Sequence, residues 1–318
     1  MTIQDFALEG KKAVTEFLRN CGIDYMTVKV TETVKTNDMR MFGLDIRDED
    51  SLLGRQIYID DLYERYTEGE DLEEMIEDVV SRCADSLTTP PPPAPFMDLE
   101  CTSDDYMERA TVRLLSVRNN ICYMDDKPYI DVGNGLALVA SINSEPSVTS
   151  EWRMTVTKDF LGHLGVDKEI FMTDALANTM KLEPPKLVKL EAMAIAQMRA
   201  GGEPDNILEK QDPDEDYSSS VYALTNSSLY QGSAVLFYPM VMRRIAEILG
   251  CGYTVIPSSV HELIIVPDRI GITHAKMREM LRAGNAELND MSDVLSYEIY
   301  HYEPGDENLR IIRECSAA

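Results

Sequence analysis

The sequence lacks the short motifs by which many catalytic and cofactor-binding proteins are recognised. Histidine is rare, with four residues in 318, at positions 163, 261, 274 and 301. The chain contains no His-Glu-x-x-His pair, Gly-x-Ser-x-Gly elbow, Walker A loop or dinucleotide glycine fingerprint. These absences exclude the zinc protease, hydrolase and nucleotide-binding classes that depend on those motifs. We expect no cofactor and no metal site.

Cysteine and long apolar runs are also scarce. Six cysteines are scattered without a Cys-x-x-Cys pair, which argues against a zinc ribbon or a disulfide framework and favours a reducing compartment. The first residues have no basic segment followed by an apolar one, so we expect no signal peptide. The longest apolar run, residues 234–242, contains Pro239 and is far too short to span a membrane. We therefore expect a cytoplasmic protein.

Basic residues are the third deficiency. Thirty Lys and Arg stand against 56 Asp and Glu, which leaves a net charge of −26. A phosphate backbone or an anionic membrane would be repelled, so we expect no direct binding to nucleic acid or to a membrane. A basic protein is the compatible partner. Residues 45–105 carry only four of the basic residues but nineteen of the acidic ones. This acidic excess is either the solvated face of a helix or a docking surface for a basic partner, including a surface that mimics DNA.

Residues 1–87 are predicted to form an acidic α+β module. Helical spacing predicts a first helix that ends near Asn20, and alternation predicts strands at 26–31, 39–46 and 56–59. The clearest helix follows Asp71, which is placed to cap it. Acidic side chains cover its outer face and account for much of the local acidity: Glu73, Glu74, Glu77 and Asp78.

Proline marks the strongest boundary. Consecutive prolines in residues 88–97 hold the chain in polyproline II and predict a stiff linker, although a ligand for a proline-binding domain is an alternative. A middle α+β segment is expected at 98–200. There we predict a helix around Tyr106 to Val117, a hairpin across Gly133-Asn-Gly135, and helices after Asp167 and after Pro184-Pro185.

The last part of the chain is predicted to form a second α+β module. Residues 201–220 carry seven acids and one lysine and are expected to be an acidic linker. Residues 221–304 have the order β-α-β-β-α-β of a ferredoxin-like module, with a tail at 305–318. Pro239 predicts a break in the helix expected at 231–249. The fold class of the whole chain is therefore expected to be α+β.

The string Pro257-Ser-Ser-Val-His-Glu262 lies between two apolar strand segments. On an extended chain Ser259 and His261 share a face, within reach of a Ser–His hydrogen bond, whereas Glu262 points to the other face. A hydrolase centred here would need further groups. Alternatively, these polar side chains satisfy hydrogen bonds at the start of a buried strand. The candidates for the further groups are Asp268, Asp290, Asp293 and His301.

Three segments carry a resemblance to a known family. Tyr222-Ala-Leu-Thr-Asn226, Gly232 to Pro239, and Ile256 to Glu262 resemble an uncharacterised bacterial family, a domain of unknown function found mainly in anaerobic gut bacteria. The early stretch around Ile57-Tyr-Ile59 is similar to the same family, although Gly54-Arg-Gln56 stands where that family usually has a proline. The resemblance covers most of the chain and implies no activity, cofactor or catalytic residue.

Three functions remain open at this point. The first is a non-enzymatic cytoplasmic protein-interaction or accessory protein. The second is a hydrolase that uses Ser259 and His261, with Glu262 as a further candidate residue. The third is an acidic DNA mimic or binder of a basic protein.

Overall fold

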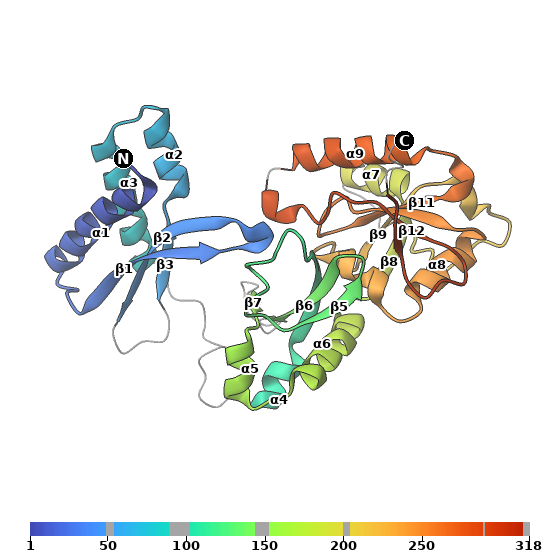
Figure 1. Ribbon diagram of the computed structural model, residues 1–318, viewed down its shortest axis with the longest axis horizontal. Coiled ribbons are helices and arrows are strands. Elements are labelled where there is room, and N and C mark those ends of the chain that lie inside the picture. Colours follow the sequence, from blue (N-terminus) through green and yellow to red (C-terminus); the bar gives the residue numbers. More distant parts are fainter. Residues whose placement is uncertain (49–53, 89–101, 144–152, 200–203, 289, 314–318) are drawn as a thin grey trace. The chain divides into compact units, whose positions relative to one another are not determined.

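The chain is an α+β protein that divides into two compact units, Met1–Ala94 and Pro95–Ala318 (Figure 1). The computed structural model describes all residues except 49–53, 89–101, 144–152, 200–203, 289 and 314–318. The expected α+β class is confirmed. Almost all of the predicted proline-rich linker, 88–97, lies outside the described residues.

The first unit is built on a three-stranded antiparallel sheet in the order β1-β2-β3. A capping box between Thr2 and Asp5 starts α1, and a backbone N–H of α3 is capped by Asp71, as predicted. Phe6 and Val79 belong to the core under the sheet, whereas the acidic face of α3 is exposed. The elements are α1 (Ile3–Asn20), β1 (Met26–Val34), β2 (Arg40–Asp48), β3 (Arg55–Tyr58), α2 (Asp60–Glu68) and α3 (Leu72–Thr88).

Helix α2 was not expected from the sequence. It buries only Leu62, so its apolar periodicity is too weak to predict a helix. Asp60, at its start, accepts a hydrogen bond from the N–H of Phe42 at 3.0 Å and so ties α2 to β2. Asp61 pairs with Arg82 of α3.

The middle sheet of the second unit has β6 at its centre, with β4 on one side and β5 and β7 on the other. The hairpin across Gly133-Asn-Gly135 is confirmed, and Asn134 takes the left-handed conformation with φ of 56°. The helix after Asp167 is also confirmed. The elements are α4 (Ser103–Glu108), β4 (Ala110–Ser116), β5 (Tyr129–Gly133), β6 (Leu136–Asn143), β7 (Arg153–Thr155), α5 (Lys158–Leu164) and α6 (Lys168–Leu182).

The helix predicted around Tyr106 to Val117 is wrong beyond Glu108, because the chain continues as strand β4. The apolar residues at 110 and 114 fit a helical repeat, but with Val112 they also fit the two-residue repeat of a strand. Pairing with β6 decides between the two repeats.

The third sheet is antiparallel, in the order β13-β12-β10-β11-β9-β8. Helix α8 covers one face, while α7 and α9 cover the other (Figure 1). As Pro239 predicts, the chain breaks there, between a 3-10 helix, η3, and α8. The elements are β8 (Pro185–Lys189), α7 (Leu190–Arg199), β9 (Tyr222–Asn226), η3 (Gly232–Phe237), α8 (Val241–Leu249), β10 (Tyr253–Ile256), β11 (Leu263–Pro267), α9 (His274–Glu287), β12 (Tyr300–Tyr302) and β13 (Arg310–Ile311).

The elements β9, α8, β10, β11, α9 and β12 follow one another in the predicted order, but their strands are not arranged as in a ferredoxin-like sheet. Strands β9 and β10 are separated by β11, which is antiparallel to both, so a split β-α-β unit is present. A ferredoxin-like sheet would place β12 beside β9, but β12 pairs with β10. Strand β8 takes the place beside β9.

The helix expected directly after Pro184-Pro185 is a strand first. Residues Pro185–Lys189 pair with β9, and α7 begins only at Leu190. Proline is tolerated because β8 is an edge strand and Pro185 is its first residue.

Two further expectations for the second unit need correction. The segment expected as an acidic linker, 201–220, contributes Ile207 and Tyr217 to the core. The strand expected at 294–302 is limited to β12, because the hydroxyl of Ser296 accepts the N–H of Glu298 in a local turn. Among the described residues, no helix is long and apolar enough to cross a membrane.

Thr179 tests how a backbone N–H on the unpaired edge of β4 finds a hydrogen-bond acceptor. Its hydroxyl accepts the N–H of Val112 at 2.9 Å and is buried. Thr179→Val leaves that N–H without a partner, so we expect the free energy of unfolding to fall by about 1–3 kcal/mol in chemical denaturation. Thr173→Val is the control: the hydroxyl of each threonine also donates to the carbonyl four residues back, but Thr173 is exposed. Equal losses in the two variants would contradict this account.

Candidate functional site

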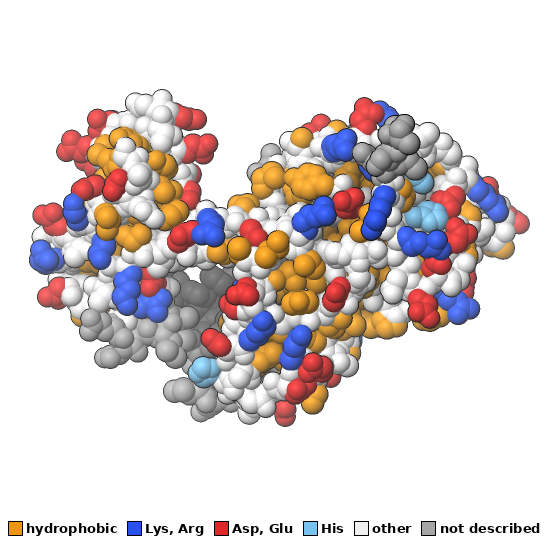
Figure 2. Space-filling model, in the orientation of Figure 1, with side chains coloured by type: hydrophobic (Ala, Val, Ile, Leu, Met, Phe, Trp, Pro, Cys, Tyr) orange, Lys and Arg blue, Asp and Glu red, His pale blue; other side chains and the backbone are white. Residues whose placement is uncertain are grey.

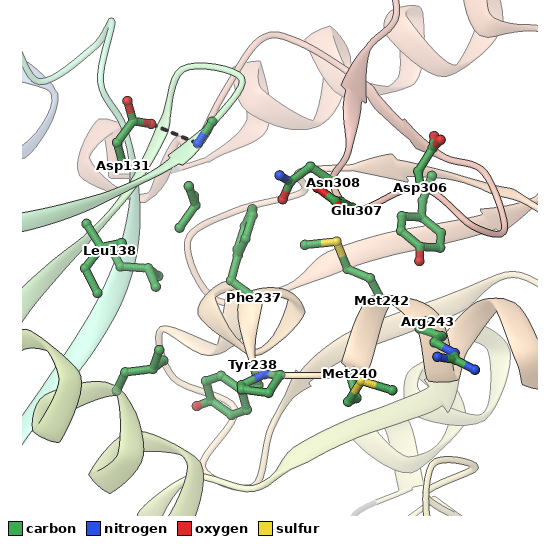
Figure 3. Close-up of a pocket in the computed structure, with 16 residues that line it drawn as sticks. Asp131, Leu138, Phe237, Tyr238, Met240, Met242, Arg243, Asp306, Glu307 and Asn308 are labelled. Atoms are coloured by element: carbon green, nitrogen blue, oxygen red, sulfur yellow. Dashed lines mark hydrogen bonds between the residues drawn. The ribbon is translucent and has the colours of Figure 1, made fainter.

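A groove of 570 Å³ lies within the second unit, between the two sheets. Its walls are the β5–β6 hairpin, the end of η3 with the start of α8, and the loop after β12 (Figure 3). The loop residues Asp306, Glu307 and Asn308 fall in the segment that the sequence suggested was only a tail.

The groove combines an apolar floor with an acidic rim. Phe237 and Met242 extend into it, and Leu138 lies on the opposite wall (Figure 3). The rim carries the carboxylates of Asp131, Asp306 and Glu307 and one cation, Arg243.

Existing contacts leave the rim acidic. Arg243 is already paired with Glu247 at 2.9 Å. Asp306 binds Arg310, and Asp131 accepts the N–H of Gly133 at 2.8 Å. Glu307 is exposed and has no ion pair among the described residues. Within the described residues, Asp131 and Glu307 therefore keep negative charge that no ion pair offsets.

The backbone is strained where the groove wall turns into α8. Met240 has φ of 69°, which is unfavourable for a residue with a side chain, and 62% of it is exposed. A strained, exposed methionine is costly to maintain, and such residues cluster at functional sites.

The other end of η3 is held by the loop that contains His261. Gly232 donates its N–H to the carbonyl of His261 at 3.0 Å, and Ser233 donates to Val260 at 3.2 Å. A Cβ at Gly232 would lie 2.6 Å from the nitrogen of Asn226 and 2.8 Å from the oxygen of His261. Only glycine permits this approach.

The imidazole of His261 uses both of its nitrogens. Nδ1 accepts the N–H of Gln231 at 3.0 Å, so the proton is on Nε2, which donates to Asp293 at 3.2 Å. The ring of Tyr230 lies 5.0 Å from the His261 ring. Gln231 has φ of 52°, and the bond to His261 helps to hold this unfavourable conformation.

Ser259 and His261 do come together, but through the backbone. The hydroxyl of Ser259 accepts the main-chain N–H of His261 at 3.0 Å, and Ser259 is buried. Residues 257–262 form a loop between β10 and β11 rather than the extended start of a strand. Both ring nitrogens of His261 are bonded to other residues, Gln231 and Asp293.

The other residues considered for a hydrolase site do not join Ser259 and His261 in one cluster. Burial raises the pKa of Glu262, and the electrostatic effect of the adjacent His261 and a hydrogen bond from Ser258 offset part of this effect. Asp290 accepts the N–H of Ser292 at 2.8 Å. Asp268 and His301 contact each other on the face of the third sheet opposite to the one from which Tyr302 lines the groove.

Comparison with known proteins identifies a family but no function. A family model described as a family of unknown function, DUF5688, matches residues 3–304. No curated protein and no solved structure matches the chain. The resemblance to a family of unknown function is thus confirmed.

His261→Ala tests the supporting role of the ring. Loss of the bonds to Gln231 and Asp293 should lower the free energy of unfolding of the second unit by about 1–3 kcal/mol. Chemical denaturation followed by circular dichroism measures the change. His163→Ala is the control, since His163 is exposed on α5. A loss no greater than that of the control would contradict a supporting role for His261.

Glu262→Gln tests the buried carboxyl. Because its pKa is raised in the folded state, the ionised carboxyl destabilises the fold as the pH rises through that value. The variant should therefore be more stable than the wild type at neutral pH. The difference should vanish below the ordinary pKa of 4.5. Denaturation across this pH range, with the exposed Glu287→Gln as a control for loss of one charge, measures the effect. A difference independent of pH would refute it.

Proposed function

We propose that the chain, which belongs to this family of unknown function, is a non-enzymatic protein that binds a basic segment of a partner protein in the groove beside Phe237. The observation that carries the proposal is the apolar floor and the carboxylate rim in a single groove. We further propose that it acts in the cytoplasm.

The chemistry of the groove supports a cationic, partly apolar occupant. Phe237 and Met242 offer contact to aliphatic side chains, while Asp131, Asp306 and Glu307 attract Lys or Arg at the rim. Its 570 Å³ is in the usual range for a binding pocket and admits a few side chains rather than a whole domain. The net charge of −26 would speed the approach of a basic partner.

The hydrogen bonds of His261 favour binding over hydrolysis. A serine hydrolase needs a ring nitrogen that receives the proton of the nucleophile. Here Nδ1 accepts from Gln231 and Nε2 donates to Asp293, and the hydroxyl of Ser259 is directed to a backbone N–H. For hydrolysis the ring would have to give up one of these two bonds.

The cysteines support a reducing compartment. Cys21, Cys83 and Cys251 are free thiols. Cys83 is buried, and burial raises the pKa of its thiol to about 11, so it carries little reactive thiolate at neutral pH.

A second site for a basic partner is the acidic face of the first unit. Figure 2 shows Asp and Glu side chains gathered around the helices α2 and α3. Glu73, Glu74 and Glu77 are exposed there. The nearby arginines Arg65 and Arg82 are already paired with carboxylates. This face is the surface that a DNA mimic would use.

A peptide-binding experiment distinguishes the groove from the acidic face of the first unit as the binding site. The probe is a labelled amphipathic peptide of leucine and lysine, compared by fluorescence anisotropy with a length-matched peptide of leucine and glutamate. We expect only the first to bind, with an affinity that falls as salt is added. Glu307→Lys and Met242→Gln should each weaken binding about tenfold, because each removes one half of the groove's chemistry.

Glu74→Lys is the matched control, because it makes the same change of charge on α3. It should leave peptide binding nearly unchanged. If Glu74→Lys weakens binding and Glu307→Lys does not, the acidic face of the first unit is the binding site and the groove is rejected. Equal effects of the two variants would mean that the peptide senses only the overall charge.

A further inference from the structure

Side chains from two distant segments of the chain converge at one end of the third sheet: Asp268, which follows β11, and the pair His301 and Glu303, at the end of β12. Their candidate ligand atoms all lie within 4.8 Å of one another. Nε2 of His301 is 3.0 Å from one carboxylate oxygen of Asp268 and 3.2 Å from the other. This cluster is separate from the groove and from the His261 loop.

The strand register explains the convergence. Tyr253 of β10 pairs with Pro267 on one side and with Tyr302 on the other. The next row across the three strands is therefore Asp268, Gly252 and Glu303. Because side chains alternate along a strand, the residues of this row share a face with His301. Tyr302 points to the opposite face, where it lines the groove.

Gly252 leaves the space into which the carboxylates lean. A Cβ there would lie 2.5 Å from Oδ2 of Asp268 and 3.2 Å from Oε2 of Glu303. The two carboxylates thus approach each other from the ends of the two strands that flank β10, across a position without a side chain. Like charges this close repel unless a cation or a proton lies between them. Among the described residues, neither carboxylate has an ion pair with Lys or Arg; the adjacent Arg269 binds the carbonyl of Gly250 instead.

A buried hydroxyl beside the cluster lacks a partner. Thr254 pairs with His301 in the ladder, so its side chain lies on the same face as the cluster. Only 1% of Thr254 is exposed, and its hydroxyl has no hydrogen-bond partner in the described part of the chain. A buried hydroxyl without a partner is unfavourable, and a water bound to an ion would supply one.

We propose that Asp268, His301 and Glu303 bind a divalent transition-metal ion. One imidazole nitrogen and two carboxylates form a mixed donor set that suits Mn²⁺ or Zn²⁺ better than Mg²⁺ or Ca²⁺, which prefer oxygen alone. Two ligand atoms 3.0 Å apart and each about 2.1 Å from one ion subtend about 90°, the angle between adjacent octahedral ligands. Glu303 is exposed, so its carboxylate is free to close the set, with water completing it.

Binding of the ion would have a structural consequence. The ion would join the end of β11 to β12 across β10 and fix the start of the 303–309 loop. The proposal does not depend on the function proposed for the groove, and its test uses no peptide.

Metal binding to the full chain is the test. After treatment with a chelator, the protein is titrated with MnCl₂ and with ZnCl₂ in calorimetry, at a salt concentration that suppresses loose binding to its acidic surface. We expect one ion per chain and a raised melting temperature. Weaker binding of MgCl₂ by about tenfold or more is also expected.

Variants locate the site. His301→Gln and Asp268→Asn should each weaken Mn²⁺ binding by at least about tenfold and abolish the shift in melting temperature. Circular dichroism checks that both variants fold. His163→Gln and Glu74→Gln, which change exposed residues of the same types elsewhere, should bind as the wild type does. If the wild type binds no ion, or if His301→Gln binds as tightly as the wild type, the proposal is overturned.

Discussion

The second unit depends on a few backbone hydrogen bonds between the His261 loop and the start of η3. The carbonyls of Val260 and His261 accept the N–H groups of Ser233 and Gly232, and the ring of His261 accepts that of Gln231. Residues Gly232–Leu236 of η3 are buried, and η3 contacts both β4 of the middle sheet and β9 of the third. A short 3-10 helix has few internal hydrogen bonds, so these contacts with the loop determine where it lies. The common core of the two sheets and one wall of the groove follow from that placement.

This arrangement gives a physical role to the segments that carry the family resemblance. Thr225 and Asn226 end β9, and the hydroxyl of Thr225 donates to the same His261 carbonyl that Gly232 uses. The buried side chain of Asn226 accepts the N–H of Tyr230 and donates to its carbonyl, which closes the loop before η3. Segments that looked like separate motifs therefore form one structural unit. Its polar residues hold η3, and with it one wall of the groove, in place, and the polar groups of Ser259 and His261 are used in these hydrogen bonds.

Neighbouring residues of strand β12 lie on opposite faces of the sheet and belong to different sites. Tyr302 faces the groove, whereas His301 and Glu303 face the cluster with Asp268. From the sequence we expected no metal site, because His301 and Glu303 alone match no metal-binding motif and Asp268 lies in a distant segment. Asp268 and His301 are 33 residues apart and meet only because β10 lies between their strands. The absence of a side chain at Gly252, which attracts no notice in the sequence, is what allows the two carboxylates to approach each other.

The sequence alone determined the features that depend on neighbouring residues. Apolar periodicity predicted α1, α3 and α6, Asn134 and its glycines predicted the hairpin, and Pro239 predicted the break before α8. Tertiary structure decided whatever depends on pairing between distant strands. It made Ala110–Ser116 and Pro185–Lys189 strands, since a partner strand outweighs a weak helical repeat, and it placed β12 beside β10. The same contrast holds for the candidate site. The sequence alone drew attention to Ser259, His261 and Glu262 as polar residues between two apolar strand segments. Their hydrogen bonds to Gln231 and Asp293, and the groove built beyond them, exist only because folding brings together backbone groups that no local spacing connects.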